Sequence, residues 1–176
     1  MSSFKLIAAV AIIVFSATLS SCGFSPLYGK RVAGQDSAED HLALIQINQI
    51  KDRVGQQLHN RLLDRLTPKG EPVNPAYVLT VDVSESVSSL GVKKSAVATR
   101  SNLRLDVSYV LMPVINTLEE ALSSGTVLAI SGYDISNSEY TTLVAAQNAR
   151  TSAVREAADD IRTRLAVYFR RQKNNP

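Results

Sequence analysis

Tyr77-Val78-Leu79-Thr80-Val81-Asp82-Val83-Ser84 is the stretch that decides the fold, because its apolar and polar residues alternate almost without exception. Successive side chains of a β-strand point to opposite faces of a sheet. The period of two therefore predicts a half-buried strand from Tyr77 to about Val87, with one apolar face and one polar face. A sheet built from such strands is expected to carry helices on one face only.

The same alternation returns after a predicted turn. Residues Ser88 to Ser95 include Gly91 and two lysines, Lys93 and Lys94, and this composition indicates a turn. From Val97 to Leu111 the odd positions are mostly apolar and the even positions are polar, which predicts a second long strand. The side chains on its polar face are Arg100, Asn102, Arg104, Asp106 and Ser108.

Two further strands are expected. The segment from Thr126 to Ile135 has apolar residues on both faces, which predicts a more central place in the sheet than its neighbours have. Gly132 lies within this segment at a position that suits a β-bulge. An apolar run from Leu42 to Ile50 favours another strand because of its length and its isoleucines.

Two segments have helical periodicity. After Asp52, a plausible helix start, an apolar residue recurs every four positions up to the stop at Thr67 to Gly70. These residues are Val54, Leu58, Leu62 and Leu66. A longer stripe runs from Ser138 to about Phe169 and consists of Ala146, Ala149, Ala153, Ala157, Ile161, Leu165 and Tyr168. The order β-α-β-β-β-α predicts an α/β fold of the α+β type, in which a mixed sheet of about four strands has two helices packed on one face.

The start of the chain has the features of a secretory signal. Lys5 precedes an apolar run from Leu6 to Leu19, which is shorter than the roughly 20 residues that a membrane-spanning helix needs. The run ends in Leu19-Ser20-Ser21-Cys22, a sequence that resembles the bacterial lipobox. We predict that residues 1–21 are removed and that Cys22 carries a covalent lipid. Residues 22–40 are then a lipid-anchored tether, because their apolar content is too low for independent folding, and residues 41–176 form a single domain.

Cys22 has a second interpretation, as a buried small hydrophobe or one half of a disulfide. It is the only cysteine of the 176 residues, so no disulfide can form within the chain. The formal net charge of +3 argues neither for nor against nucleic acid, and the predicted export argues against it.

The sequence offers little catalytic chemistry. Neither His41 nor His59 has a Cys, Asp or Glu nearby at metal-ligand spacing, and both are expected to be solvated surface residues. No glycine-rich phosphate loop is present. We therefore predict no catalytic residue, no metal site and no cofactor apart from the lipid on Cys22.

Cations on the polar face of the sheet are the candidate binding residues. Arg100 and Arg104 lie four apart on one strand and hence on one face, roughly 13 Å apart, and Lys93 and Lys94 precede them in the turn. Guanidinium groups bind phosphate bidentately. The alternative is that the arginines pair with Asp82, Glu85 or Asp106, or keep an exposed face soluble.

A resemblance to a known family adds to these predictions. Cys22-Gly23-Phe24-Ser25-Pro26-Leu27-Tyr28-Gly29 resembles the start of mature LptE lipoproteins of the alphaproteobacterial type, and Gly132-Tyr133-Asp134 followed by the alanine-rich stretch Tyr140 to Phe169 extends the match. The resemblance implies an outer-membrane lipoprotein facing the periplasm. It would fold with, and plug the lumen of, an LptD-type β-barrel and bind lipopolysaccharide through its basic residues. The alternative is a transport-accessory lipoprotein that binds another lipid or a glycan without a barrel partner.

Overall fold

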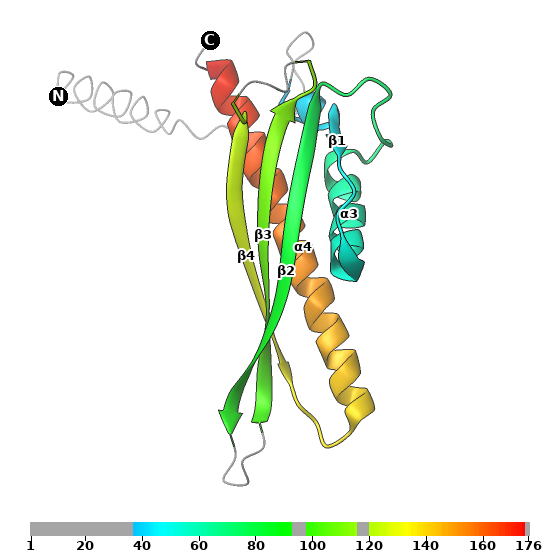
Figure 1. Cartoon of the computed structure of the whole chain (residues 1–176), viewed down its shortest axis with the longest axis vertical. Helices are drawn as coiled ribbons and strands as arrows, with labels where there is room; N and C mark the ends of the chain where they lie inside the picture. Colours follow the sequence, from blue (N-terminus) through cyan, green and yellow to red (C-terminus); the bar gives the residue numbers. More distant parts are fainter. Residues whose placement is uncertain (1–36, 93–97, 116–119, 175–176) are drawn as a thin grey trace, which may run out of the picture. The chain divides into compact units, whose positions relative to one another are not determined.

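The computed structural model describes residues 37–92, 98–115 and 120–174, all within the compact unit Gly34–Pro176. In chain order the elements are α2 (Ala38–Leu42), β1 (Ile45–Ile47), α3 (Asp52–Leu66), β2 (Tyr77–Val92), β3 (Ala98–Pro113), β4 (Ser123–Asp134) and α4 (Glu139–Asn174). The predicted α+β class, with a mixed four-stranded sheet and helices packed on it, is confirmed (Figure 1). The predicted signal, Cys22, most of the tether and the two lysines Lys93 and Lys94 lie outside the described residues.

The sheet has the strand order β1-β2-β3-β4, in which β1 is parallel to β2 and the other neighbours are antiparallel. The odd residues of the long strands point to the helices, as their alternation predicted, and Leu79, Leu105 and Leu111 are completely buried. Helix α3 packs on β1 and β2, whereas α4 packs on β3 and β4. Both helices thus cover the same face and leave the other one open.

Most of the segment from Leu42 to Ile50, which was predicted to be a strand, does not form one. Only Ile45–Ile47 is a strand, and the short helix α2 precedes it. Helix α2 forms because Ser37 caps it: the Ser37 hydroxyl accepts a hydrogen bond from the Asp40 amide, and the Asp40 carboxylate accepts one from the Ser37 amide. Helix α2 and its cap therefore overlap the last residues of the segment assigned to the tether.

Helix α3 matches its prediction closely. It starts at Asp52, and Leu58, Leu62 and Leu66 of the predicted stripe are buried. The fourth stripe residue, Val54, is only half-buried, because Gly55 rather than Val54 faces Ile50. A Cβ atom on Gly55 would lie 2.7 Å from the Ile50 Cγ2 atom, so the glycine lets the helix approach the chain that leads into it.

The predictions for the strand near Gly132 were wrong in two respects. Strand β4 is at the edge of the sheet, not near its centre, because it pairs with β3 alone. The apolar residues on its second face are not covered, and Leu128 and Ile130 are about half-exposed. Gly132 pairs regularly with Asn102, without a bulge. The predicted turn from Ser88 is also too early, since β2 continues to Val92.

Helix α4 is longer than predicted and is buried along only part of its length. Its buried residues are Ala149, Ala153, Val154, Ala157, Ala158, Ile161, Leu165, Ala166 and Phe169. The many alanines allow the helix axis to lie close to the sheet. Its first turns protrude, with Tyr140 and Leu143 exposed, and Arg150 fixes this half of the helix to Glu85 of β2 through two hydrogen bonds of 2.6 Å.

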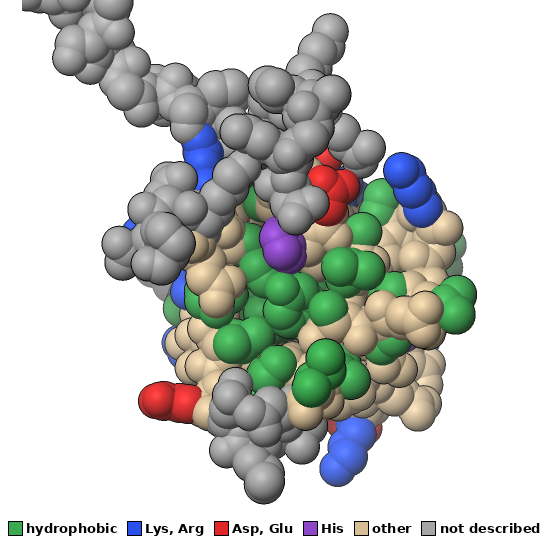
Figure 2. All heavy atoms as spheres, turned by 90° about the horizontal axis from the view of Figure 1, so that it is seen from above, with side chains coloured by type: hydrophobic (Ala, Val, Ile, Leu, Met, Phe, Trp, Pro, Cys, Tyr) green, Lys and Arg blue, Asp and Glu red, His purple; other side chains and the backbone are tan. Residues whose placement is uncertain are grey.

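An aromatic cluster closes one end of the unit. His41 of α2 stacks on Phe169 of α4 at a ring-centroid distance of 5.1 Å, and Tyr77 lies 5.0 Å from Phe169. The Tyr77 hydroxyl and His41 Nδ1 are hydrogen-bonded at 3.2 Å. His41 is therefore a half-buried packing residue and not the solvated surface histidine that was predicted. Figure 2 shows this end, where apolar side chains surround a histidine.

Candidate functional site: the open face of the sheet

The open face is formed by the even-numbered residues of β2, β3 and β4. The registers place them in rows across the three strands: Asp82 is opposite Ser108, which is opposite Thr126, and Ser84 is opposite Asp106, which is opposite Leu128. Side chains that are directly opposite in an antiparallel pair have Cβ atoms about 5 Å apart. The strand pairing therefore brings six side chains from three separate segments into one compact array.

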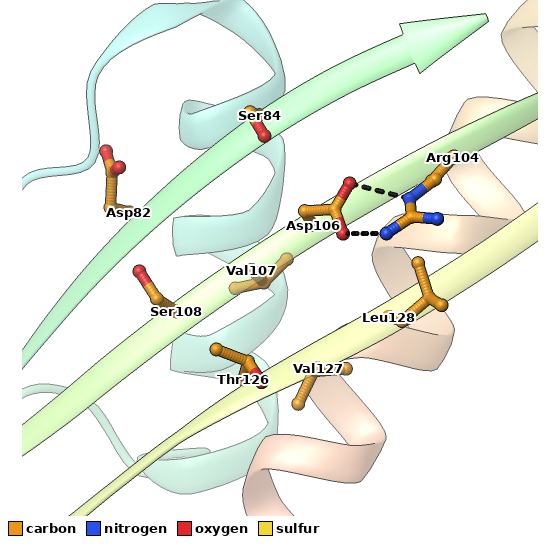
Figure 3. Close-up of a pocket in the computed structure, with 9 residues that line it drawn as sticks. All are labelled: Asp82, Ser84, Arg104, Asp106, Val107, Ser108, Thr126, Val127 and Leu128. Carbon is orange, nitrogen blue, oxygen red and sulfur yellow. Dashed lines mark hydrogen bonds and ion pairs between the residues drawn. The ribbon is translucent and has the colours of Figure 1, made fainter.

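These side chains line a shallow hollow of about 450 Å³ (Figure 3). It is lined by Asp82, Ser84, Arg104, Asp106, Val107, Ser108, Thr126, Val127 and Leu128. The two valines are buried from the helix side and contribute the floor. The walls present three hydroxyls, two carboxylates, one guanidinium and one half-exposed leucine, which is a surface suited to a ligand that has both hydroxyl groups and apolar edges.

Arg104 is already paired within the hollow. Its Nε atom donates to Asp106 Oδ2 at 2.8 Å, and its Nη2 atom donates to Asp106 Oδ1 at 2.7 Å. These bonds raise the pKa of Arg104 and lower the pKa of Asp106 below its ordinary value, although both side chains remain about half-exposed. The alternative that the sequence left open for Arg104, an ion pair with Asp106, is thus present in the structure.

Arg100 lies apart from the hollow. It is exposed, it is opposite Asp134 of β4, and its guanidinium extends over Gly132, where an added Cβ atom would lie 3.1 Å from Arg100 Nη2. Within the described ranges, no acidic side chain is in ion-pair contact with Arg100. The structure therefore confirms that both arginines are on the open face, but only Arg104 belongs to the hollow.

A second hollow lies beside α3. It measures about 420 Å³ and is lined by Ile47, Gln49, Ile50, Gln56, His59 and Asn60. His59 is thus half-buried among amide side chains and not simply solvated. No group of three or more metal-ligating side chains occurs among residues 37–92, 98–115 and 120–174, and none of the helices in those ranges is long and apolar enough to cross a membrane.

Sequence reasoning missed the part of the hollow that β4 contributes. Asp82 and Ser84 were assigned to the polar face, but Thr126 and Leu128 belong to a strand that was expected to be buried on both sides. The residue types of β4 gave no signal of an exposed face, because the run from Val127 to Ile130 is apolar on both faces. Only burial separates the faces, since the odd residues Val127 and Ala129 are buried and the even residues are not. The two-residue spacing of Arg104 and Asp106, which places both on one face, made their pairing foreseeable.

Comparison with solved structures defines the class of protein first. A candidate lipoprotein from Caulobacter crescentus CB15 matches with a TM-score of 0.60 and 25% identity over 74% of this chain and 94% of that one. A minor lipoprotein from Acinetobacter baumannii (TM-score 0.56, 18% identity, 70% and 90% covered) and the rare lipoprotein B of Shewanella oneidensis (0.53, 16%, 73% and 96%) share the fold. The fold is therefore that of a group of small bacterial lipoproteins.

The family follows from the sequence comparison. The model of the lipopolysaccharide-assembly family LptE matches residues 40–165, which is most of the chain, and the chain belongs to that family. An uncharacterized protein from Rickettsia prowazekii (strain Madrid E) is 24% identical over 164 residues, covering 92% of this chain and 97% of that protein. The predicted resemblance to LptE lipoproteins is confirmed, and with it a role in lipopolysaccharide assembly.

Proposed function

We propose that this chain is an outer-membrane lipoprotein, anchored through Cys22, that assembles lipopolysaccharide at the cell surface together with an LptD-type β-barrel. Its part is non-enzymatic: it assists the folding of the barrel, fills the barrel lumen and contacts lipopolysaccharide. Membership of the LptE family supports the assembly role.

The open face of the sheet is the observation that carries the proposal. The lumen of a large outer-membrane barrel is polar and wet. A sheet face rich in serine, threonine, aspartate and arginine side chains suits such surroundings without a helix to cover it, while α3 and α4 pack on the opposite face.

Lipopolysaccharide offers two chemistries to this face. The exposed guanidinium of Arg100 suits a phosphate group, and Lys93 and Lys94, which precede Arg100 in the sequence, are the further candidate cations. The hollow holds two carboxylates against one guanidinium, so it favours sugar hydroxyls over a further anion. Arg104 can still donate through the N–H groups that Asp106 does not occupy.

Site-specific crosslinking in cells tests the barrel partner. Photo-crosslinkers at Thr80 and Ser108, both exposed on the open face, should capture one outer-membrane barrel, and a tagged chain should co-purify with it stoichiometrically. A crosslinker at the buried Ala153 is the control and should capture nothing. If single cysteines at the two open-face positions were freely labelled from the periplasm and no barrel was captured, the independent lipid- or glycan-binding lipoprotein would replace this proposal.

Metabolic labelling tests the anchor. The variant Cys22→Ala lacks the only thiol of the chain and should incorporate no palmitate, while Ser25→Ala, outside the lipobox, should be labelled like the wild type. Equal labelling of Cys22→Ala and wild type would contradict the anchor but would leave the barrel test unaffected.

A further inference from the structure

Exposed apolar side chains gather at the end of the unit where β2 begins and β3 ends (Figure 2). Ile115 and Val73 are 97% and 93% exposed, and Leu44 and Val114 are more than one-third exposed. We call these four residues the apolar end. Single exposed apolar residues are ordinary, but a cluster of them marks a contact surface.

Backbone hydrogen bonds hold the apolar end together. The Ala76 amide donates to the Leu44 carbonyl at 3.0 Å, and the Val114 amide donates to the Ala76 carbonyl at 3.0 Å. Val73 lies three residues before Ala76 in the same connection. Leu44 and Val114 are therefore held together at the termini of three neighbouring strands, and Val73 and Ile115 lie within three residues of these hydrogen-bonded positions in the sequence.

The described chain also begins at this end. The aromatic contacts of His41 with Phe169 and Tyr77 fix α2 there, and Ser37 is the residue that caps α2. Fifteen positions separate Ser37 from Cys22. A peptide of that length spans at most about 50 Å when fully extended, and the mean end-to-end distance of a chain is shorter than its full extension. A lipid on Cys22 would thus enter the bilayer closer to the apolar end than to the opposite tip of the sheet.

We infer that the apolar end docks on the glycerophospholipid leaflet into which the acylated Cys22 inserts, when the chain is not yet bound to its barrel partner. This inference rests on the lipid anchor of the proposed function. The acyl chains supply most of the membrane affinity. The apolar end fixes the orientation of the domain on the bilayer, because its aliphatic side chains contact the lipid. Tyr77 and His41 lie behind these side chains, and both residue types are tolerated at a membrane interface.

Docking in this orientation has a consequence for assembly. The open face lies along the length of the strands, whereas the apolar end lies at their termini. The open face would therefore stay clear of the bilayer and remain accessible to an incoming barrel. Leu128 and Ile130, which are exposed on that face, would not contact lipid.

Fluorescence quenching tests the docking. The chain has no tryptophan, so a single introduced indole is a specific reporter. The full acylated protein carrying Ile115→Trp is reconstituted on vesicles of phosphatidylethanolamine and phosphatidylglycerol with brominated acyl chains. The matched control is Leu143→Trp, also exposed, which precedes Phe169 by 26 residues, or roughly 39 Å along α4. We expect blue-shifted emission and at least about twofold stronger quenching at position 115 than at position 143.

A second pair of variants removes the dependence on an added indole at Ile115. Adding Ile115→Asn to a Val73→Trp reporter should weaken its quenching, whereas adding Leu143→Asn should not. Equal quenching of the Ile115→Trp and Leu143→Trp variants on vesicles that carry the protein would overturn the docking while the anchor stands. If the wild-type chain carried no acyl group on Cys22 when it was isolated from membranes, and did not float with the vesicles, the anchor and the docking would be overturned together.

Discussion

Loss of the ion pair between Glu85 and Arg150 should loosen the first turns of α4, up to the buried Ala149, from the sheet. This ion pair joins the first turns of α4 to β2, beyond the stretch of β2 on which α3 packs. Both Arg150 donors are 2.6 Å from the Glu85 oxygens, and the side chains are only 20% and 30% exposed for Glu85 and Arg150, respectively. These bonds raise the pKa of Arg150, so the guanidinium is charged at every ordinary pH.

The expected cost of Glu85→Gln lies between two limits. Fully exposed pairs contribute about 0.2–1 kcal/mol, whereas removal of one partner from a fully buried pair costs about 3–5 kcal/mol. Because water still reaches this pair, we expect a loss of about 1–2 kcal/mol in the free energy of unfolding. For a domain of this size, that corresponds to a fall in Tm of roughly 3–6 °C.

Thermal denaturation of the lipid-free protein measures this loss, and hydrogen exchange over residues 139–150 localises it. Asp160→Asn is the matched control, because it breaks an exposed pair with Arg164 within α4 and should cost no more than about 0.5 kcal/mol. A double-mutant cycle with Arg150→Gln isolates the coupling. If Glu85→Gln destabilised the protein no more than Asp160→Asn, and exchange in the first turns of α4 were unchanged, the assigned role of the pair would be refuted.

Three further predictions concern packing and the open face. Gly55→Ala should lower Tm, because the new methyl group is forced against Ile50 at a cost of about 1–3 kcal/mol, which exceeds the roughly 1 kcal/mol gained in helix propensity. In an NMR titration, Asp106 should stay ionised at pH values below 3.8, which is the ordinary pKa of an aspartate. Its pairing with Arg104 should be lost only as the pH falls through the lowered pKa of Asp106. The variant Arg104→Ala should raise the pKa of Asp106 again. Arg100→Ala should weaken lipopolysaccharide binding by about tenfold, and Arg104→Ala by less, since Asp106 already occupies two of the donors of Arg104; equal effects would argue against separate roles.

Local periodicity determined the elements that are regular over many residues. The alternation from Tyr77 onward places Thr80, Asp82 and Ser84 on the open face, and the stripe of α4 places Ala153, Ile161 and other apolar side chains against the sheet. Both patterns follow from the geometry of a single strand or helix, so they can be recognised without knowledge of the partner segments.

Short elements were less predictable. The run from Leu42 to Ile50 is apolar whether it forms a helix or a strand, and the outcome depends on the Ser37 cap and on Phe169, which is more than 120 residues away. His41 owes its burial to the same distant ring. A local pattern carries no information about such a contact.

By itself, the sequence determined the fold class, the long strands and helices with regular periodicity, the polar face and the family resemblance. Only the tertiary structure decided that β4 is at the edge, that its half-exposed Leu128 joins Asp82 and Asp106 around one hollow, and that Leu44 and Val114 meet at one end of the sheet. The physical reason is that side-chain periodicity is fixed within one segment. Strand order and the gathering of residues from separate segments depend instead on which distant segments pair, and that choice is made by the burial and hydrogen bonding of the whole sheet.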